Sequence, residues 1–179
     1  RKKCSAIERL ALRNPRAFSQ SQFGFRAGVG CNFALLTIAL FVELGNRVET
    51  TWRDAAGARK TRKHATLVVC VDCASAFCKA NGAVAMRRLR EIGLDAEAFW
   101  VGSFLQKRTL RVKYEDAVSG SVDLDSGVPQ GTILGPLLWS LVVDPLLRTL
   151  EDHCRDDVDG TLAIVSTFAD DSNFAVQGP

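Results

Sequence analysis

Three aspartates have the chemistry and the placement to hold metal ions. Asp72 directly follows the apolar run at residues 65–71, while Asp170 and Asp171 separate the apolar runs at 162–168 and 172–176. Carboxylates beside buried strands cost free energy unless something offsets their charge, and Mg²⁺ prefers such oxygen ligands. Two ions about 4 Å apart are suited to in-line nucleotidyl transfer. The spacing alone does not show that these aspartates meet, and paired aspartates at a hairpin tip are also ordinary turn chemistry.

The segments that must position these aspartates alternate between helical and extended patterns. Helices are predicted over 1–13, 33–48, 82–92, 95–105 and 136–151, and strands over 65–71, 110–114, 162–168 and 172–176. Asn32 and Asp95 are the expected helix N-caps. The strand at 65–71 is expected to be buried on both faces, and that at 110–114 on one face. This order of elements predicts an α+β fold.

Three charged segments are expected to be exposed to solvent, and one of them could also contact phosphates. The segment from Thr50 to His64 carries five cations and is expected to be an exposed connection, either a solvated loop or a contact for phosphates. The arginines at 87, 88 and 90 are expected on a solvated helix face. The acidic stretch at 151–160 lacks the calcium-loop pattern and is expected to be a solvated loop.

Composition places the chain among globular domains. It has 179 residues, 47% of them hydrophobic and 24% charged, with a formal net charge of +3, which permits a nucleic-acid partner without requiring one. The longest apolar stretch, 33–42, is too short to span a bilayer, and no signal-peptide pattern follows the first residues. The chain opens with Arg1 and its single methionine is Met86, so a piece of a longer product is expected.

The six cysteines are expected to be reduced thiols of an intracellular protein. Cys70 and Cys73 form a C-x-x-C pair, which could indicate a zinc or redox site. Residues three apart on a strand point to opposite faces, and there is no second C-x-x-C pair. A zinc or redox site is therefore disfavoured, and this pair too is expected to be ordinary reduced thiols.

Five blocks, in order, resemble the conserved boxes of reverse transcriptases of the non-LTR retrotransposon branch. They are Gln22–Arg26 (Q-F-G-F-R), Val69–Phe77 (a strand followed by D-x-x-x-A-F), Ser103–Leu105 with Arg108 and Val112, Ser126–Leu138 (G-V-P-Q-G-x-x-L-x-P-x-L) and Phe168–Asp171 (F-x-D-D). The resemblance implies an RNA-directed DNA polymerase with a right-hand palm, an antiparallel sheet backed by helices. Residues 1–64 would be part of the fingers with a connecting helix and loop, and 65–179 the palm.

The resemblance also implies roles for the carboxylates. Asp72, Asp170 and Asp171 would bind two Mg²⁺ ions, or Mn²⁺ in their place, with Asp72 and Asp170 as direct ligands and Asp171 more peripheral. The backbone carbonyl of Cys73 would help to hold a metal ion. Cys78 stands where the family often has an aspartate, at a position that is not a metal ligand.

Other residues would bind the substrate. The backbone amides of Ser75 and Ala76 would face the incoming triphosphate, and Phe77 would pack under the sugar and exclude a 2′-hydroxyl, although a core aromatic is the alternative. Gln130 would contact the incoming nucleotide. Gly131 would let the backbone approach the template–primer. Arg26 would be either a nucleic-acid contact or an exposed arginine of the fingers.

The implied partners are an RNA template, a DNA primer and deoxynucleoside triphosphates, in the nucleus and without a membrane; no oligomeric state is implied. The family's basic fingers strands are expected before Arg1, and its primer grip and thumb after Pro179, so the isolated chain is expected to be inactive or very weak. Three alternatives remain: an inactive relic or RNA-binding palm, a maturase-like splicing factor, and a generic α+β domain.

Overall fold

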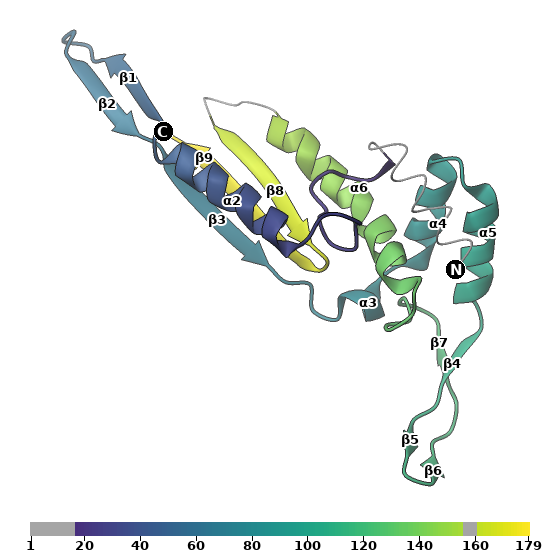
Figure 1. Ribbon diagram of the computed structural model, residues 1–179. Coiled ribbons are helices and arrows are strands. Elements are labelled where there is room, and N and C mark those ends of the chain that lie inside the picture. Colours follow the sequence, from purple (N-terminus) through teal and green to yellow (C-terminus); the bar gives the residue numbers. More distant parts are fainter. Residues whose placement is uncertain (1–16, 156–160) are drawn as a thin grey trace. The chain divides into compact units, whose positions relative to one another are not determined.

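The computed structural model describes residues 17–155 and 161–179, which form two compact units (Figure 1). The sheet unit consists of Ser19–Cys73 and Leu146–Pro179, and the helical unit of Ala74–Pro145 together with Ala17 and Phe18. The helix expected at 1–13 and the acidic residues Asp156, Asp157 and Asp159 lie outside the described residues. Within the described ranges, no helix combines the length and the apolar character needed to cross a bilayer.

A three-stranded antiparallel sheet organises the sheet unit. β9 (Asp171–Gly178) lies in the centre, between β3 (Ala65–Val71) and β8 (Leu162–Phe168). Helix α2 (Cys31–Gly45) packs against all three strands. The hydroxyl of Ser166 donates to the carbonyl of Ala34 at 3.0 Å, which ties β8 to this helix. The strands predicted at 162–168 and 172–176 and the apolar helix before them are thus confirmed.

Two local predictions in this unit are wrong. The residue that precedes α2 as its cap is Gly30, not Asn32, and it makes no side-chain capping bond. β3 is not buried on both faces, because it is an edge strand and α2 covers only one face of the sheet. Leu67 is 64% exposed. A continuous apolar run therefore did not indicate a fully covered strand here.

The segment expected as an exposed connection is a β-hairpin. β1 (Glu49–Arg53) pairs with β2 (Arg59–Lys63) in antiparallel register. Asp54 closes the loop, since its carboxylate accepts hydrogen bonds from the amides of Ala56 and Ala58 at 3.0 and 2.9 Å. Gly57 supplies a positive φ of 79°. The expectation of exposure is confirmed, and the expectation of a loop is wrong because this Asp/Gly turn chemistry was overlooked.

The helical unit contains α3 (Ala76–Lys79), α4 (Gly82–Glu91), α5 (Asp95–Leu105) and the first half of α6 (Gly135–Arg155). The Asn81 side chain caps α4 by accepting from the amide of Ala83. Asp95 is not a cap; it lies inside the first turn of α5, after Leu94, where a carboxylate favours the helix dipole. α6 runs to Arg155 and so takes in the beginning of the expected acidic loop. The core of the helical unit is made of fully buried small and branched side chains, among them Ala85, Leu89, Ala98, Val101 and Leu138.

The strand predicted at 110–114 is wrong in both extent and burial. β4 (Arg108–Leu110) pairs with β7 (Val122–Leu124), and β5 (Lys113–Tyr114) pairs with β6 (Ala117–Val118), which gives a narrow two-stranded arm (Figure 1). Tyr114 is 74% exposed. Alternating apolar residues in this arm have no sheet face to pack against.

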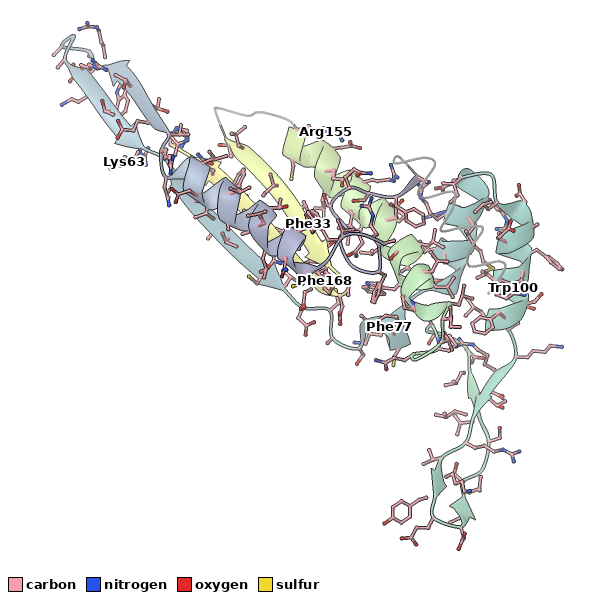
Figure 2. All side chains as sticks on the ribbon, viewed as in Figure 1. Phe33, Lys63, Phe77, Trp100, Arg155 and Phe168 are labelled. Atoms are coloured by element: carbon pink, nitrogen blue, oxygen red, sulfur yellow. The ribbon has the colours of Figure 1, made fainter. Side chains whose placement is uncertain are left out.

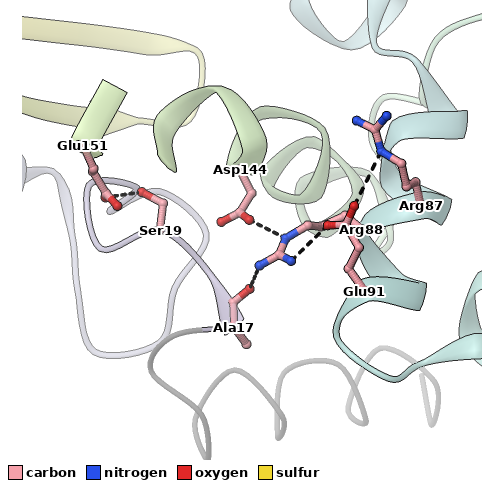
Figure 3. A network of polar contacts seen from close by, with 7 residues as sticks. All are labelled: Ala17, Ser19, Arg87, Arg88, Glu91, Asp144 and Glu151. Atoms are coloured by element: carbon pink, nitrogen blue, oxygen red, sulfur yellow. Dashed lines mark hydrogen bonds and ion pairs between the residues drawn. The ribbon is translucent and has the colours of Figure 1, made fainter. Parts of the chain in front are cut away.

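Arg88 does not lie on a solvated helix face, in contrast to the expectation for residues 87, 88 and 90. Its guanidinium forms an ion pair with the buried Asp144 and donates to the carbonyl of Ala17 at 2.9 Å (Figure 3). A second ion pair, with Glu91, measures 3.2 Å and is half exposed. A buried pair of this kind depends on both partners, because removing one leaves a buried charge without compensation.

Replacing Asp144 by Asn should therefore lower the free energy of unfolding by about 3 kcal/mol, since Arg88 stays buried without its carboxylate. The measurement is urea unfolding of the 179-residue chain. Glu91→Gln is the matched control, because it removes the exposed partner of the same arginine and should cost less than about 1 kcal/mol. Equal losses in the two variants would contradict the assigned role of Asp144.

Candidate active site

Asp170 and Asp171 lie at the tip of the hairpin that joins β8 to β9. Phe168 pairs with Asp171, so Ala169 and Asp170 form a two-residue turn. Ala169 has a φ of 60°, the conformation of the first residue in the hairpin turns that match strand twist. The turn is thus part of the sheet's geometry and holds the two aspartates at one end of the central strand.

The register of β3 brings Asp72 to the same end of the sheet. Val71 pairs with Ser172 on β9, and Asp72 is the next residue along the chain. Asp72 and Asp171 both line a hollow of about 320 Å³, together with Ser172, Asn173 and Cys70. Two carboxylates that are far apart in sequence therefore share one concave surface.

The three aspartates do not form a closed metal cage. Asp170 does not line this hollow, and within residues 17–155 and 161–179 no group of three His, Cys, Asp or Glu side chains could hold an ion. Asp72 and Asp171 are exposed and Asp170 is half-buried. The expectation that burial would make their charge costly is therefore wrong, because β3 beside them is open to solvent.

The side chain of Gln22 clamps the turn that carries the aspartates. Its Nε2 donates to the carbonyl of Ala169 at 3.1 Å, and its Oε1 accepts from the amides of Ala169 at 3.1 Å and Gly24 at 2.8 Å. Gln22 is 3% exposed, so these bonds replace water that it has lost. The carboxamide of Gln22 thus pairs with both the amide and the carbonyl of Ala169, as the backbone of a neighbouring strand does in a sheet.

Gly24 makes this close approach possible. A Cβ atom at this position would lie 2.3 Å from the backbone nitrogen of Ala169, so any other residue would push the turn away. The glycine and the glutamine of the Q-F-G-F-R block thus both act on the F-A-D-D block. Neither role was predicted from the sequence; the Q-x-G spacing was the signal for it.

The same segment is fixed to β8 and to α6. The amide of Phe23 donates to the carbonyl of Thr167 at 2.8 Å, and the amide of Thr167 donates to the carbonyl of Ser21 at 2.7 Å. Glu151 on α6 accepts from the hydroxyl of Ser19 (Figure 3) and also from the amide of Ser21. Burial raises the pKa of Glu151, but these hydrogen bonds outweigh it and hold the pKa below its ordinary value.

Arg26 is half-buried and has a local structural role. Its guanidinium donates to the carbonyls of Gln22 at 3.1 Å and Ser19 at 3.4 Å, which closes the loop around the clamp. The alternative of a simply exposed arginine is wrong. A contact with nucleic acid stays a prediction.

The remaining site residues flank the start of the helical unit. Cys73 is exposed and ends the sheet unit, Ser75 has a φ of 58° and precedes α3, and Ala76 is buried. Phe77 stacks on Trp139 with ring centroids 5.6 Å apart, so part of its surface belongs to the core, which was the alternative interpretation. Its exclusion of a 2′-hydroxyl stays a prediction.

The P-Q-G loop is anchored beside Phe77. The amide of Val128 donates to the carbonyl of Phe77 at 2.7 Å. Gly127 has a φ of 79°, and a Cβ there would lie 2.5 Å from the carbonyl oxygen of Cys78. Beyond this anchor Gln130 and Gly131 are exposed, and Gly131 has a φ of 77° with open space around it. The structure therefore brings the second and fourth sequence blocks together and leaves the tip of the loop accessible.

Comparison with known proteins identifies the family. Residues 2–179 match the family model described as reverse transcriptase (RNA-dependent DNA polymerase). The match covers almost the whole chain, and the chain belongs to this family. The family predicted from the five sequence blocks is confirmed, as is the α+β fold of helices and antiparallel strands.

Two relatives come from non-LTR retrotransposons of Drosophila melanogaster. The 115 kDa protein in the type-1 retrotransposable element R1DM is 29% identical over 137 residues, which is 75% of this chain and 12% of the relative. The RNA-directed DNA polymerase from the mobile element jockey is 34% identical over 74 residues, 40% of this chain and 8% of the relative. The chain thus spans a small share of the length of the relatives that it matches.

Replacing Gln22 by Ala should loosen the turn that carries the aspartates. The substitution leaves the amides of Ala169 and Gly24 without their acceptor, so their hydrogen exchange should accelerate by about tenfold or more. Amide exchange followed by NMR on the 179-residue chain measures this. Gln106→Ala, at an exposed glutamine, is the control. Unchanged exchange at Ala169 in the Gln22 variant would show that the clamp does not hold the turn.

Proposed function

We propose that this chain is the catalytic centre of an RNA-directed DNA polymerase of a non-LTR retrotransposon. The observation that carries the proposal is the pairing of β3 with β9, which leads Asp72 and Asp171 into one hollow at the end of the sheet. Membership of the reverse transcriptase family supports the same chemistry. The substrates would be an RNA template, a DNA primer and deoxynucleoside triphosphates, and the place of action the nucleus.

The antiparallel sheet β3–β9–β8, backed by the helix α2, supports our assignment of residues 65–179 to the palm. We assign residues 1–64 to part of the fingers with a connecting helix, α2, and a connecting segment. Both compact units contain residues of the proposed site. The assignment follows the sequence blocks rather than the boundaries of the units.

The donor set fits a hard divalent cation. Reverse transcriptases generally use divalent metal ions. Mg²⁺ is commonly bound through one or two carboxylates and completed by water and substrate phosphates, which agrees with a hollow that offers two carboxylates and no third. Asp72 and Asp171, which share the hollow, would hold one ion, so we propose a direct role for Asp171 instead of the peripheral one implied by the resemblance. Asp170 and the carbonyl of Cys73 would be available to a second ion. Bound there, two Mg²⁺ ions would lower the pKa of the primer 3′-hydroxyl and neutralise charge on the triphosphate.

The chain's own groups would position the substrate. The amides of Ser75 and Ala76 would face the triphosphate, and the ring of Phe77, held by Trp139, would meet a 2′-hydroxyl sterically. Gln130 would contact the nucleotide from its exposed loop, and Gly131 would allow the template–primer close to the backbone. Arg26 would contact nucleic acid only through those guanidinium N–H groups that do not already donate to the carbonyls of Ser19 and Gln22.

Replacing Asp72, Asp170 or Asp171 by Asn in the full-length protein should lower primer extension on an RNA template by about a hundredfold or more, since even the outer partners of metal ligands are worth 10- to 100-fold. Asp95→Asn, at an exposed carboxylate in the first turn of α5, is the matched control and should leave extension unchanged. RNA binding should persist in every variant. Extension at the parental rate after loss of Asp72 or Asp171 would refute the proposed site, and a parent that binds RNA without extending a primer would indicate a binding module.

A further inference from the structure

The β1–β2 hairpin is an exposed, basic ribbon to which the polymerase chemistry assigns no role. Its strands pack on each other, and all ten strand residues are exposed. Figure 1 shows it extending beyond the end of the sheet at which β3 begins, and Figure 2 places Lys63 at its base. An isolated two-stranded ribbon is only marginally stable in water, so a binding partner would favour its order.

The hairpin carries more positive charges than nearby carboxylates can neutralise. The hairpin carries Arg53, Arg59, Lys60, Arg62 and Lys63 against two carboxylates, Glu49 and Asp54. Lys60 forms a long ion pair of 3.8 Å with Asp54, and Glu49 pairs in register with Lys63. Arg53 lies directly opposite Arg59, and like charges at opposed positions destabilise a ribbon. An anion between them would remove that repulsion.

One face of the ribbon combines cations with an aromatic ring. Alternate residues share a face, so Trp52 and its partner Lys60 lie on the same face as Thr50 and its partner Arg62. Trp52 is 46% exposed. An exposed ring between cations suits a strand with unpaired bases, which stack on the ring while the phosphates meet the cations. A duplex hides its base faces and would not use the ring.

We propose that the β1–β2 hairpin binds single-stranded RNA, through stacking on Trp52 and phosphate contacts of Lys60 and Arg62, which lie on the same face as the ring. The choice of RNA as the occupant rests on the proposed polymerase function, which supplies an unpaired template strand. The surface itself is independent of catalysis. It lies at the far end of β3 from Asp72.

Fluorescence anisotropy with a labelled, unstructured 20-nucleotide RNA tests the proposal on the 179-residue chain, with EDTA and without nucleotides. Lys60→Glu with Arg62→Glu should weaken binding by about tenfold or more and reduce the salt dependence by about 0.7 per lost phosphate contact. Arg87→Glu with Arg90→Glu, at two exposed arginines of α4, makes the same change in net charge and is the matched control. Equal weakening in the two double variants would overturn the proposal in favour of a solvated ribbon.

Trp52→Ala should weaken RNA binding by about tenfold, and Trp52→Phe, which keeps a ring, by much less. The same titrations with a 20-base-pair DNA duplex should show no dependence on Trp52. A similar loss for RNA and duplex would overturn stacking on unpaired bases. Because these titrations contain neither a free divalent ion nor a nucleotide, failure of the polymerase proposal would appear in primer extension and not in RNA binding.

Discussion

The position of β9 between β3 and β8 is the constraint on which the candidate site depends. Both neighbouring strands run antiparallel to β9, and the pairs Val71–Ser172 and Phe168–Asp171 lie at the same end of the sheet. A slip of one residue in either ladder would turn every side chain of β9 to the other face. Asp171 would then leave the hollow that it shares with Asp72. Strand register therefore decides which carboxylates can lie together at the candidate site.

Buried polar side chains lie at both ends of β9, but only at one end are their hydrogen-bonding groups satisfied. Every polar atom of the Gln22 carboxamide has a backbone partner, which makes burial of this side chain tolerable. At the other end of β9, Gln177 Nε2 and Thr66 Oγ1 are buried without a hydrogen-bond partner, beside the close approach of Gly45. Groups of that kind cost about 1–3 kcal/mol each. The buried polar atoms of the sheet unit thus have more complete hydrogen bonding at the turn that carries Asp170 and Asp171 than at the opposite end of β9.

Local patterns predicted much of this architecture. The helices at 82–92 and 95–105 and the hairpin strands after Thr161 have strong periodicity or turn signals, and they are present. Burial was predicted poorly, because a run such as Leu67–Val71 records only that a strand forms and not what covers it. Arg88 looked like a surface cation because its partner Asp144 is 56 positions away. The five blocks predicted the family, yet not that Gln22 holds Ala169, a contact between residues 147 positions apart.

The sheet unit also separates its charges along the length of β3. The cations of the β1–β2 hairpin lie next to the first residue of this strand, and Asp72 follows the last. Seven residues at about 3.3 Å each place the two groups on the order of 23 Å apart, more than twice the Debye length of about 10 Å at 0.1 M salt. The hairpin cannot neutralise the aspartates at that distance. Under the proposed function, an anionic strand that reaches the carboxylate end would need cations bound there, so the basic hairpin and a metal ion in the hollow would act on one nucleic-acid strand at different places.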